Sequence, residues 1–214
     1  MVALNDALRM SPEEFLAWEE TQPLRHEYLN GYAYAMSGGT SDHSGIAINL
    51  AALLRSPVRD RGCRLRGSDF NVFVSSKGPY FYPNLSVSCH LEDITAEKGF
   101  SYPSLLIEVL SPSTAVFDMG EKFGHYQQIK ALQEYILVQT KKPIVLHYQK
   151  NSQNQWWLEQ YVPINLNQES TQVAIQEALQ SVTLQFRTLN FTTTLADIYE
   201  DVIFQISPPF PTTN

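Results

Sequence analysis

The stretch Leu-Leu-Ile-Glu-Val-Leu-Ser-Pro-Ser-Thr at residues 105–114 decides the fold of this chain. Its first six residues are branched and apolar except for one acid, which is the pattern of a strand buried on both faces of a sheet. The exception is Glu108. Because an isolated charge is very costly to bury, this carboxyl must be paired, protonated or bound to a metal ion. The strand ends at Ser111-Pro112, and Ser113 or Thr114 can cap a helix that follows.

A helix is expected directly after this strand, over residues 115–126. Lys122 and Tyr126 are four residues apart, so they share one face of that helix. The helix can therefore bring a lysine near the buried acid. Two interpretations of Glu108 stay open from these residues alone: a structural ion pair with an Arg or Lys, or part of a functional site. The other polar residues on this helix are Asp118, Glu121 and His125.

Short motifs in a fixed order extend this pattern along the chain. They are Met10–Phe15, Arg25–Gly31, Gly67-Ser68-Asp69, Tyr82-Pro83, Glu108–Thr114, Phe117-Asp118, Gly120–Phe123 with Tyr126, and Leu195–Tyr199. Together they resemble the Uma-type family of restriction endonucleases, which belongs to the PD-(D/E)XK nuclease superfamily. The resemblance covers roughly residues 10 to 203, and several motifs in the right order are far more specific than any one of them.

The resemblance implies a fold class. The class is α/β with a mixed sheet, built on the αβββαβ core of restriction endonucleases, with an added N-terminal hairpin and added C-terminal strands. One domain is expected over residues 10–203, and residues 204–214 are expected to form a disordered tail. The composition agrees with one domain, because 214 residues at 43% hydrophobic content can bury one sizeable core.

The resemblance also implies a reaction, the hydrolysis of phosphodiester bonds in DNA. Acids on adjacent strands of the superfamily hold Mg²⁺ or Mn²⁺, which favour oxygen ligands. Glu108 matches the strand acid, as a metal ligand and catalytic residue. The superfamily's lysine two residues later is absent, because Leu110 stands there, but the Uma-type family places it on the following helix, where Lys122 stands. Tyr126 is expected to support the site from the same helix.

Two residues near the N-terminus have weaker signals. The resembled family places a Glu of its Arg-His-Glu-Tyr motif near the active site, which makes Glu27 a further catalytic candidate. From spacing alone, Glu27 would instead lie on the surface of an edge strand. His43 is in the first turn of a helix expected over residues 41–56, and it is expected to be a surface or capping residue rather than a ligand.

One position departs from the resembled family. The family's first metal-binding acid follows Tyr-Pro, and here Tyr82-Pro83 is followed by Asn84. An amide oxygen can coordinate a metal, so Asn84 stays a candidate ligand beside Glu108, but it brings no charge. Two functions therefore stay open. One is a metal-dependent endonuclease, and the other is a nuclease-fold protein that has lost cleavage and acts by binding DNA or a protein partner.

The charge distribution bears on the DNA partner. A net charge of −7 argues against a protein that coats nucleic acid by bulk electrostatics. Residues 55–66 nevertheless hold a local basic cluster, which is either a contact for DNA phosphates or a solvated helix end and loop. Cutting both DNA strands is easiest with two sites related by two-fold symmetry, which would make the protein a homodimer. The clustered residues are Arg55, Arg59, Arg61, Arg64 and Arg66.

The two cysteines, Cys63 and Cys89, have no metal-ligand spacing and are expected to be packed thiols in a reducing, cytoplasmic setting. No membrane partner is expected, because no apolar run approaches the length of a membrane span and residues 1–10 lack the layout of a signal peptide.

Cap and turn signals place the remaining elements. A helix is expected to begin at Ser11-Pro12, and a hairpin over residues 26–36 is expected to turn at Asn30-Gly31. Further strands are expected at residues 64–74, 80–89, 134–139, 143–149, 156–161 and 182–186, with a polar loop at 163–180 and a closing helix at 195–202.

Overall fold

The expected buried strand is β8 (Leu105–Leu110), an inner strand of a six-stranded sheet in a computed structural model. All six of its residues are buried. It pairs in parallel with β9 (Glu134–Gln139) and antiparallel with β6 (Leu85–Ser88). The predicted α/β class with a mixed sheet is therefore confirmed. The structure describes residues 9–36, 38–164, 166 and 170–204.

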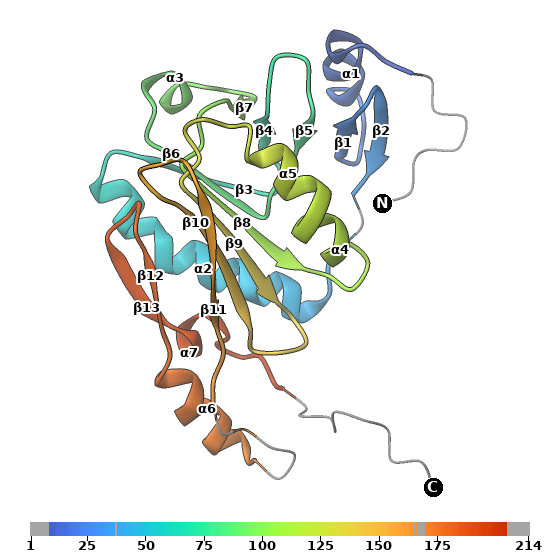
Figure 1. The fold of residues 1–214 in the computed structure, drawn as a ribbon. Coiled ribbons are helices and arrows are strands. Elements are labelled where there is room, and N and C mark those ends of the chain that lie inside the picture. The colour runs from blue at the N-terminus through green and yellow to red at the C-terminus, as the bar shows by residue number, and fades with distance from the viewer. Residues whose placement is uncertain (1–8, 37, 165, 167–169, 205–214) are drawn as a thin grey trace, which may run out of the picture.

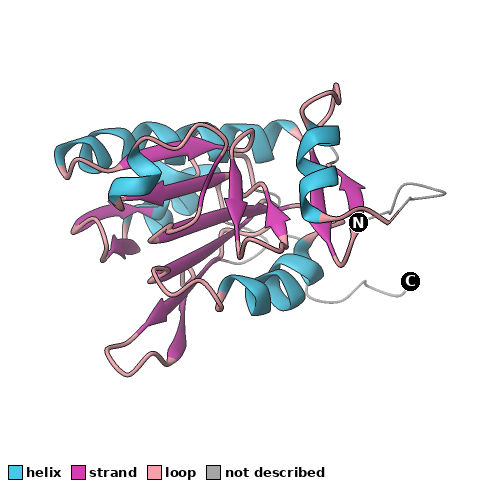
Figure 2. Cartoon of the chain, turned by 90° about the horizontal axis from the view of Figure 1, so that it is seen from above, coloured by secondary structure: helices cyan, strands magenta, loops and turns pink. Residues whose placement is uncertain are grey.

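Helices cover both faces of this large sheet (Figures 1 and 2). On one face, α2 (Ser41–Asp60) packs its apolar side against the odd-numbered residues of β8. On the other face lies a helical segment formed by α4 (Ala115–Phe117), η1 (Asp118–Lys122) and α5 (Phe123–Tyr126), which packs on Leu106 and Leu110. Alternate strand residues point to opposite faces, so Glu108 points toward this second helical segment. The sheet order is β11-β10-β9-β8-β6-β3, with β10 (Val145–Lys150), β11 (Trp156–Tyr161) and β3 (Arg64–Gly67) as the remaining strands.

A smaller sheet lies beside the large one and carries the N-terminal hairpin. Ser11 caps α1 (Pro12–Glu19) with a capping box, as its sequence predicts. The hairpin turns at Asn30 and Gly31, whose φ angles of 54° and 91° are positive, as its tight turn requires. The strand order of this smaller sheet is β2-β1-β5-β4-β7. Its strands are β2 (Tyr32–Ala35), β1 (His26–Leu29), β5 (Tyr80–Phe81), β4 (Asn71–Phe73) and β7 (Gly99–Phe100).

The expected strands 64–74 and 80–89 are each broken in two, and each passes from one sheet to the other. The first breaks after Gly67, between β3 and β4. The second breaks at Tyr82-Pro83-Asn84, between β5 and β6, where Pro83 has no N–H to donate to a sheet ladder. Both breaks leave short irregular segments at the seam between the sheets.

The C-terminal part corrects a further expectation. Residues 163–180 were expected to be a polar loop, but they contain α6 (Gln172–Gln180). Thr171 caps this helix, and Ile175 and Leu179, four residues apart, pack into the main core while polar residues cover the outside. Next come β12 (Thr183–Phe186), β13 (Phe191–Thr194) and α7 (Leu195–Ile198), while the short α3 (Leu91–Ile94) lies earlier, after β6. Phe204 is also buried in the core, and the rest of the predicted tail, 205–214, lies outside the described residues.

Cys63 and Cys89 form a disulfide, so the expectation of two packed thiols is wrong. β3 and β6 pair antiparallel with Arg64 opposite Ser88, and the next cross-strand pair brings the two cysteines together with their Cα atoms 4.2 Å apart. Because 26 positions separate the cysteines along the chain, spacing alone does not reveal the pairing. Among the described residues, no helix is both long and apolar enough to cross a membrane.

Candidate active site

A cleft of about 930 Å³ opens where β8 ends. Its walls come from distant parts of the chain: the hairpin strand β1, the first turns of α2, the break before β6, the loop after β8 and the helical segment α4–α5. Hydroxyl groups of Ser111, Ser113 and Thr114 lie on that loop at the edge of the cleft and bond to one another. The breaks in the strands therefore make room for a polar site.

The ammonium group of Lys122 joins the acidic side chains that line the cleft. Its Nζ lies 2.8 Å from Glu108 Oε1 and 2.8 Å from Glu27 Oε1. Asp118 Oδ1 lies 3.6 Å from the same nitrogen. Tyr126 donates a hydrogen bond to Glu108 Oε1 at 3.3 Å. Two strand acids and two helix residues that the sequence singled out are therefore in direct contact, and a third acid joins them.

The helical segment reaches the site because it widens into a π-helix. η1 spans Asp118–Lys122 between the two short α-helical pieces, and both of its end residues are buried. π-bulges are rare and often occur at functional sites, because the extra residue changes which side chains face inward. Here the two inward residues are an acid and a lysine, four positions apart, on the face that meets Glu108.

The charges in this cluster do not balance. Three carboxyls surround one ammonium, which leaves two excess negative charges if all are ionised. Burial raises the pKa of Glu108 to about 8, despite the Lys122 ammonium and with help from the two neighbouring carboxylates. Burial opposes the charged form of Lys122, but the carboxylates around it prevail and hold its pKa well above the ordinary value. Burial thus favours the protonated form of Glu108, while the surrounding carboxylates favour the charged form of Lys122.

Asn84 bridges the two strands beside Glu108. Its side-chain Oδ1 accepts a hydrogen bond from the Val109 backbone N–H at 2.7 Å, and its own backbone N–H donates to Glu108 Oε2 at 3.3 Å. The β6–β8 ladder pairs residues up to Leu85 and Ile107, so the Asn84 side chain continues the bonding where the ladder ends. Its other polar atom, Nδ2, faces His43 Nε2 at 3.3 Å.

The structure brings Glu27, His43 and Asp118 to the cleft, although spacing alone did not place any of them there. Glu27 is only 6% exposed and accepts a hydrogen bond from the Tyr82 backbone, unlike an edge-strand surface residue. His43 was expected to be a surface or capping residue, but it lines the cleft. Burial lowers the pKa of His43, against the opposing effects of the Val109 backbone and the Asp118 carboxylate. Asp118 could have been found from its spacing of four from Lys122, whereas nothing local marks His43.

Comparisons with known proteins agree with this architecture. Residues 12–188 match the Uma2 family, which is described as a putative restriction endonuclease family. The chain belongs to the Uma2 family. Two uncharacterized proteins of Synechocystis sp. (strain ATCC 27184 / PCC 6803 / Kazusa) are similar to this Uma2 chain. They are slr1290, 37% identical over 72% of this chain and 80% of its own length, and sll1609, 33% identical over 73% and 89%.

A solved structure shares the Uma2 chain's fold. It is the crystal structure of a putative nuclease belonging to DUF820 from Anabaena variabilis, with a TM-score of 0.66 and 18% sequence identity over 89% of this chain and 97% of that one. The order α2, β3, β6, β8, the α4–α5 segment and β9 follows the predicted αβββαβ core. At this identity the likeness concerns the fold alone.

The arginine cluster of this Uma2 chain runs from the far end of α2 to the edge of the cleft, where Arg66 directly precedes the lining residue Gly67. His43 is in the first turn of α2 and Arg59 in its last, about 24 Å apart at 1.5 Å per residue. Arg61 donates to the Leu189 carbonyl, and Arg66 stacks over Phe70. None of the five arginines is among the described residues that line the cleft.

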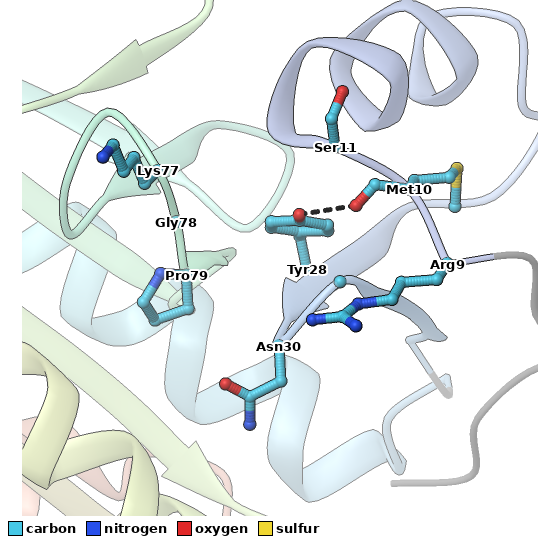
Figure 3. Close-up of a pocket in the computed structure, with 9 residues that line it drawn as sticks. Arg9, Met10, Ser11, Tyr28, Asn30, Lys77, Gly78 and Pro79 are labelled. Atoms are coloured by element: carbon cyan, nitrogen blue, oxygen red, sulfur yellow. Dashed lines mark hydrogen bonds between the residues drawn. The ribbon is translucent and has the colours of Figure 1, made fainter.

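A second hollow, of about 600 Å³, lies beside the hairpin turn (Figure 3). Tyr28 lies in it and donates a hydrogen bond to the Met10 carbonyl at 2.7 Å. Arg9 runs along the turn, whereas Lys77 points away from it, so the two cations of this hollow do not converge on one point (Figure 3). We assign no function to this hollow.

Proposed function

We propose that this Uma2 chain is a DNA endonuclease that hydrolyses phosphodiester bonds with a divalent cation, Mg²⁺ or Mn²⁺. The observation that carries the proposal is the convergence of Glu27 and Glu108 on one cationic position, 2.8 Å each from the Lys122 nitrogen, in an open polar cleft. Two strand carboxylates with a lysine beside them are the groups that this reaction needs.

The donor set fits such a cation. Mg²⁺ is commonly held by one or two carboxylates with water in the other positions. The excess of carboxyls over ammonium favours an added positive charge. In the described part of the chain, no group of three or more His, Cys, Asp or Glu side chains could hold a metal ion as it stands, and the Lys122 ammonium lies 2.8 Å from both glutamates. Glu108 and Glu27 would hold the cation once the Lys122 ammonium moved away from them. Asn84 Oδ1 has a second lone pair and stays a neutral candidate.

The side chains would divide the work as follows. When bound, a divalent cation supplies Lewis acidity toward the scissile phosphate and a more acidic water. Glu108 and Glu27 hold it, and the Tyr126 hydroxyl fixes the orientation of Glu108 by its hydrogen bond. Lys122, released from the carboxylates, stabilises the negative charge that develops on the phosphate.

The substrate and assembly are part of the proposal. DNA phosphates would enter along the hydroxyl-bearing loop that follows β8. The arginines on α2 and β3 would then contact phosphates of a longer duplex outside the cleft itself. A homodimer would place two such clefts on the two strands.

Cleavage assays test this proposal. Purified protein is incubated with plasmid and oligonucleotide DNA in Mg²⁺ or Mn²⁺, next to Glu108→Gln and the control Glu121→Gln. Glu121 is on the same helical segment but exposed and outside the cleft. We expect cleavage by the natural protein and the control, and none by Glu108→Gln. Intact DNA with every ion and both substrates would overturn the proposal.

A second candidate function rests on Asn84. The uncharged amide weakens any cation site at this position, which favours a protein that binds DNA or a protein partner without cutting. A gel-shift assay run beside the cleavage assay separates the two. DNA that shifts but stays intact with the natural protein, and is cut by Asn84→Asp, would favour the second function. Cleavage that disappears with Glu108→Gln would exclude it.

A further inference from the structure

The hydrogen bonds around Asn84 determine which way its amide group faces. A backbone N–H can only donate, so the Asn84 atom 2.7 Å from the Val109 nitrogen must be the carbonyl oxygen. The amide nitrogen of Asn84 is therefore the atom that faces His43 Nε2 at 3.3 Å. The orientation follows from the bonding partners and not from the appearance of the amide.

The orientation of Asn84 in turn determines the state of His43. A side-chain NH₂ group only donates, so Nε2 of His43 must accept, and the ring proton lies on Nδ1. The alternative, a proton on Nε2, would leave two donors facing each other at Asn84. On the other side of the ring, a Cβ at Gly39 would collide with Nδ1 of His43, so this ring position requires a glycine there.

We propose that His43 is a positioning residue of the site: its Nε2 holds the Asn84 carboxamide, which in turn holds Glu108. Asn84 makes two hydrogen bonds at this point of β8. Its backbone N–H donates to Glu108 Oε2, and its Oδ1 accepts from the backbone N–H of the next residue, Val109. A shift of Asn84 would therefore shift the carboxylate. The inference rests on the proposed function insofar as Glu108 is taken to bind the metal.

This arrangement links His43 to the presence of an asparagine at position 84, where the resembled family has an acid. An aspartate there has no donor, so it would require a proton on Nε2. The asparagine instead requires the Nδ1–H form. The two residues thus form a matched pair, in which the neutral amide keeps a fixed place through a neutral imidazole.

Long-range ¹H–¹⁵N spectra of the histidine side chains test the pairing directly and require neither metal nor DNA. Loss of one set of signals in His43→Gln assigns the ring. We expect the natural protein to show a protonated Nδ1 and an unprotonated Nε2 for His43, and Asn84→Asp to move the proton to Nε2. A proton on Nε2 in the natural protein, or no change with Asn84→Asp, would overturn the proposal.

Calorimetric titration with Mn²⁺ tests the effect on Glu108. Loss of a residue that orients a metal ligand typically weakens binding 10–100-fold, so we expect His43→Ala to weaken it about tenfold. His43→Gln should recover most of the loss, because its carbonyl oxygen can accept the same bond. His90→Gln is the matched control, since His90 is exposed and does not line the cleft. Equal affinities for the natural protein and His43→Ala, or no recovery with His43→Gln, would overturn the proposal.

The two experiments also separate this proposal from the proposed function. If the natural protein binds no Mn²⁺ and cuts no DNA, the endonuclease proposal fails, while the histidine spectra still support or reject the His43–Asn84 pair.

Discussion

Glu108 on β8 and Glu134 on β9 are glutamates on neighbouring parallel strands, 5% and 1% exposed. Glu134 lies opposite Leu105, at the start of its strand, whereas Glu108 lies near the end of β8. The two carboxyls therefore lie at different levels of the paired strands, and both are almost fully buried. Their partners differ, and so do their expected roles.

Glu134 is saturated with donors. It accepts hydrogen bonds from His147 Nε2, the Arg187 and Thr188 backbone N–H groups and the Thr188 hydroxyl. Burial would raise the pKa of Glu134, but the bond from His147 and the other donors outweigh burial and lower it. Glu134 thus ties β9 to β10 and to the turn after β12. It is a structural acid.

Glu108 has fewer donors and more neighbouring charge. Its contacts are one ammonium, one tyrosine hydroxyl and one backbone N–H, with two more carboxyls around the same lysine. The contrast teaches that burial alone does not identify a functional acid. A buried carboxyl that lacks enough donors and opens onto a cleft is the candidate, because its charge still calls for a partner.

The largest expected effect is on activity. Glu108→Gln removes a unit charge in contact with the cation, worth roughly 4 kcal/mol at 4 Å in a protein-like medium, so cleavage should fall about a thousandfold. Glu134→Gln should keep the rate per folded molecule. Initial rates of plasmid nicking, corrected for the folded fraction, check this. Equal losses of rate in both variants would break the contrast between the two acids.

Asn84→Asp tests the same contrast by adding a negative charge beside Glu108 and none beside Glu134. We expect the affinity for Mn²⁺ to rise on the order of a hundredfold, because the added carboxylate attracts the cation, though less strongly than Glu108 does. Calorimetric titration of both proteins at one pH measures it. An affinity that stays the same or falls would mean that position 84 does not face the cation.

For stability we expect the opposite ranking of the two variants, with the larger loss in Glu134→Gln. Glu134→Gln places an NH₂ group against donors and should lower the free energy of unfolding by about 2 kcal/mol, since a buried donor without its acceptor is costly. Glu108→Gln should leave the free energy of unfolding unchanged or higher near pH 8, where it removes an unfavourable buried charge. Urea denaturation followed by circular dichroism measures both. A larger loss with Glu108→Gln would invert the assignment.

A further expectation is a pH dependence of stability, with opposite signs at the two acids. Because the pKa of Glu108 is raised from 4.5 to about 8, the folded protein holds a proton between these values that the unfolded chain has released. Raising the pH through this window therefore lowers stability, by at most about 1.4 kcal/mol per pH unit. Glu134, with a lowered pKa, contributes stability that is lost only as the pH falls below its ordinary value of 4.5.

Thermal melting between pH 5 and pH 9 tests this without metal. The natural protein should lose stability toward pH 8 relative to Glu108→Gln, whose side chain does not titrate. Parallel curves for the two proteins would show that Glu108 is already ionised at pH 5.

Local patterns were enough for many elements. The cap at Ser11, the turn at Asn30-Gly31 and the bounds of β8, β9 and β11 were all predicted, because caps, turns and continuous apolar runs depend on neighbouring residues. The polar stretch containing α6 was missed because only two of its positions, Ile175 and Leu179, are buried. The sequence also predicted part of the charge cluster around Lys122, because the spacing of Lys122 and Tyr126 places both on one face of the helix after β8.

The sequence alone determined that a buried acid stands in a strand before a helix with a lysine, that the family motifs occur in order, and that position 84 is an amide. Only the tertiary structure decided that Glu27 is buried against that lysine, that Asp118 joins it through a π-helix, and that His43 pairs with Asn84. The same holds for the disulfide between Cys63 and Cys89. The reason is physical. Each of these contacts joins side chains on different elements, so it depends on sheet register and helix position, which no local spacing encodes.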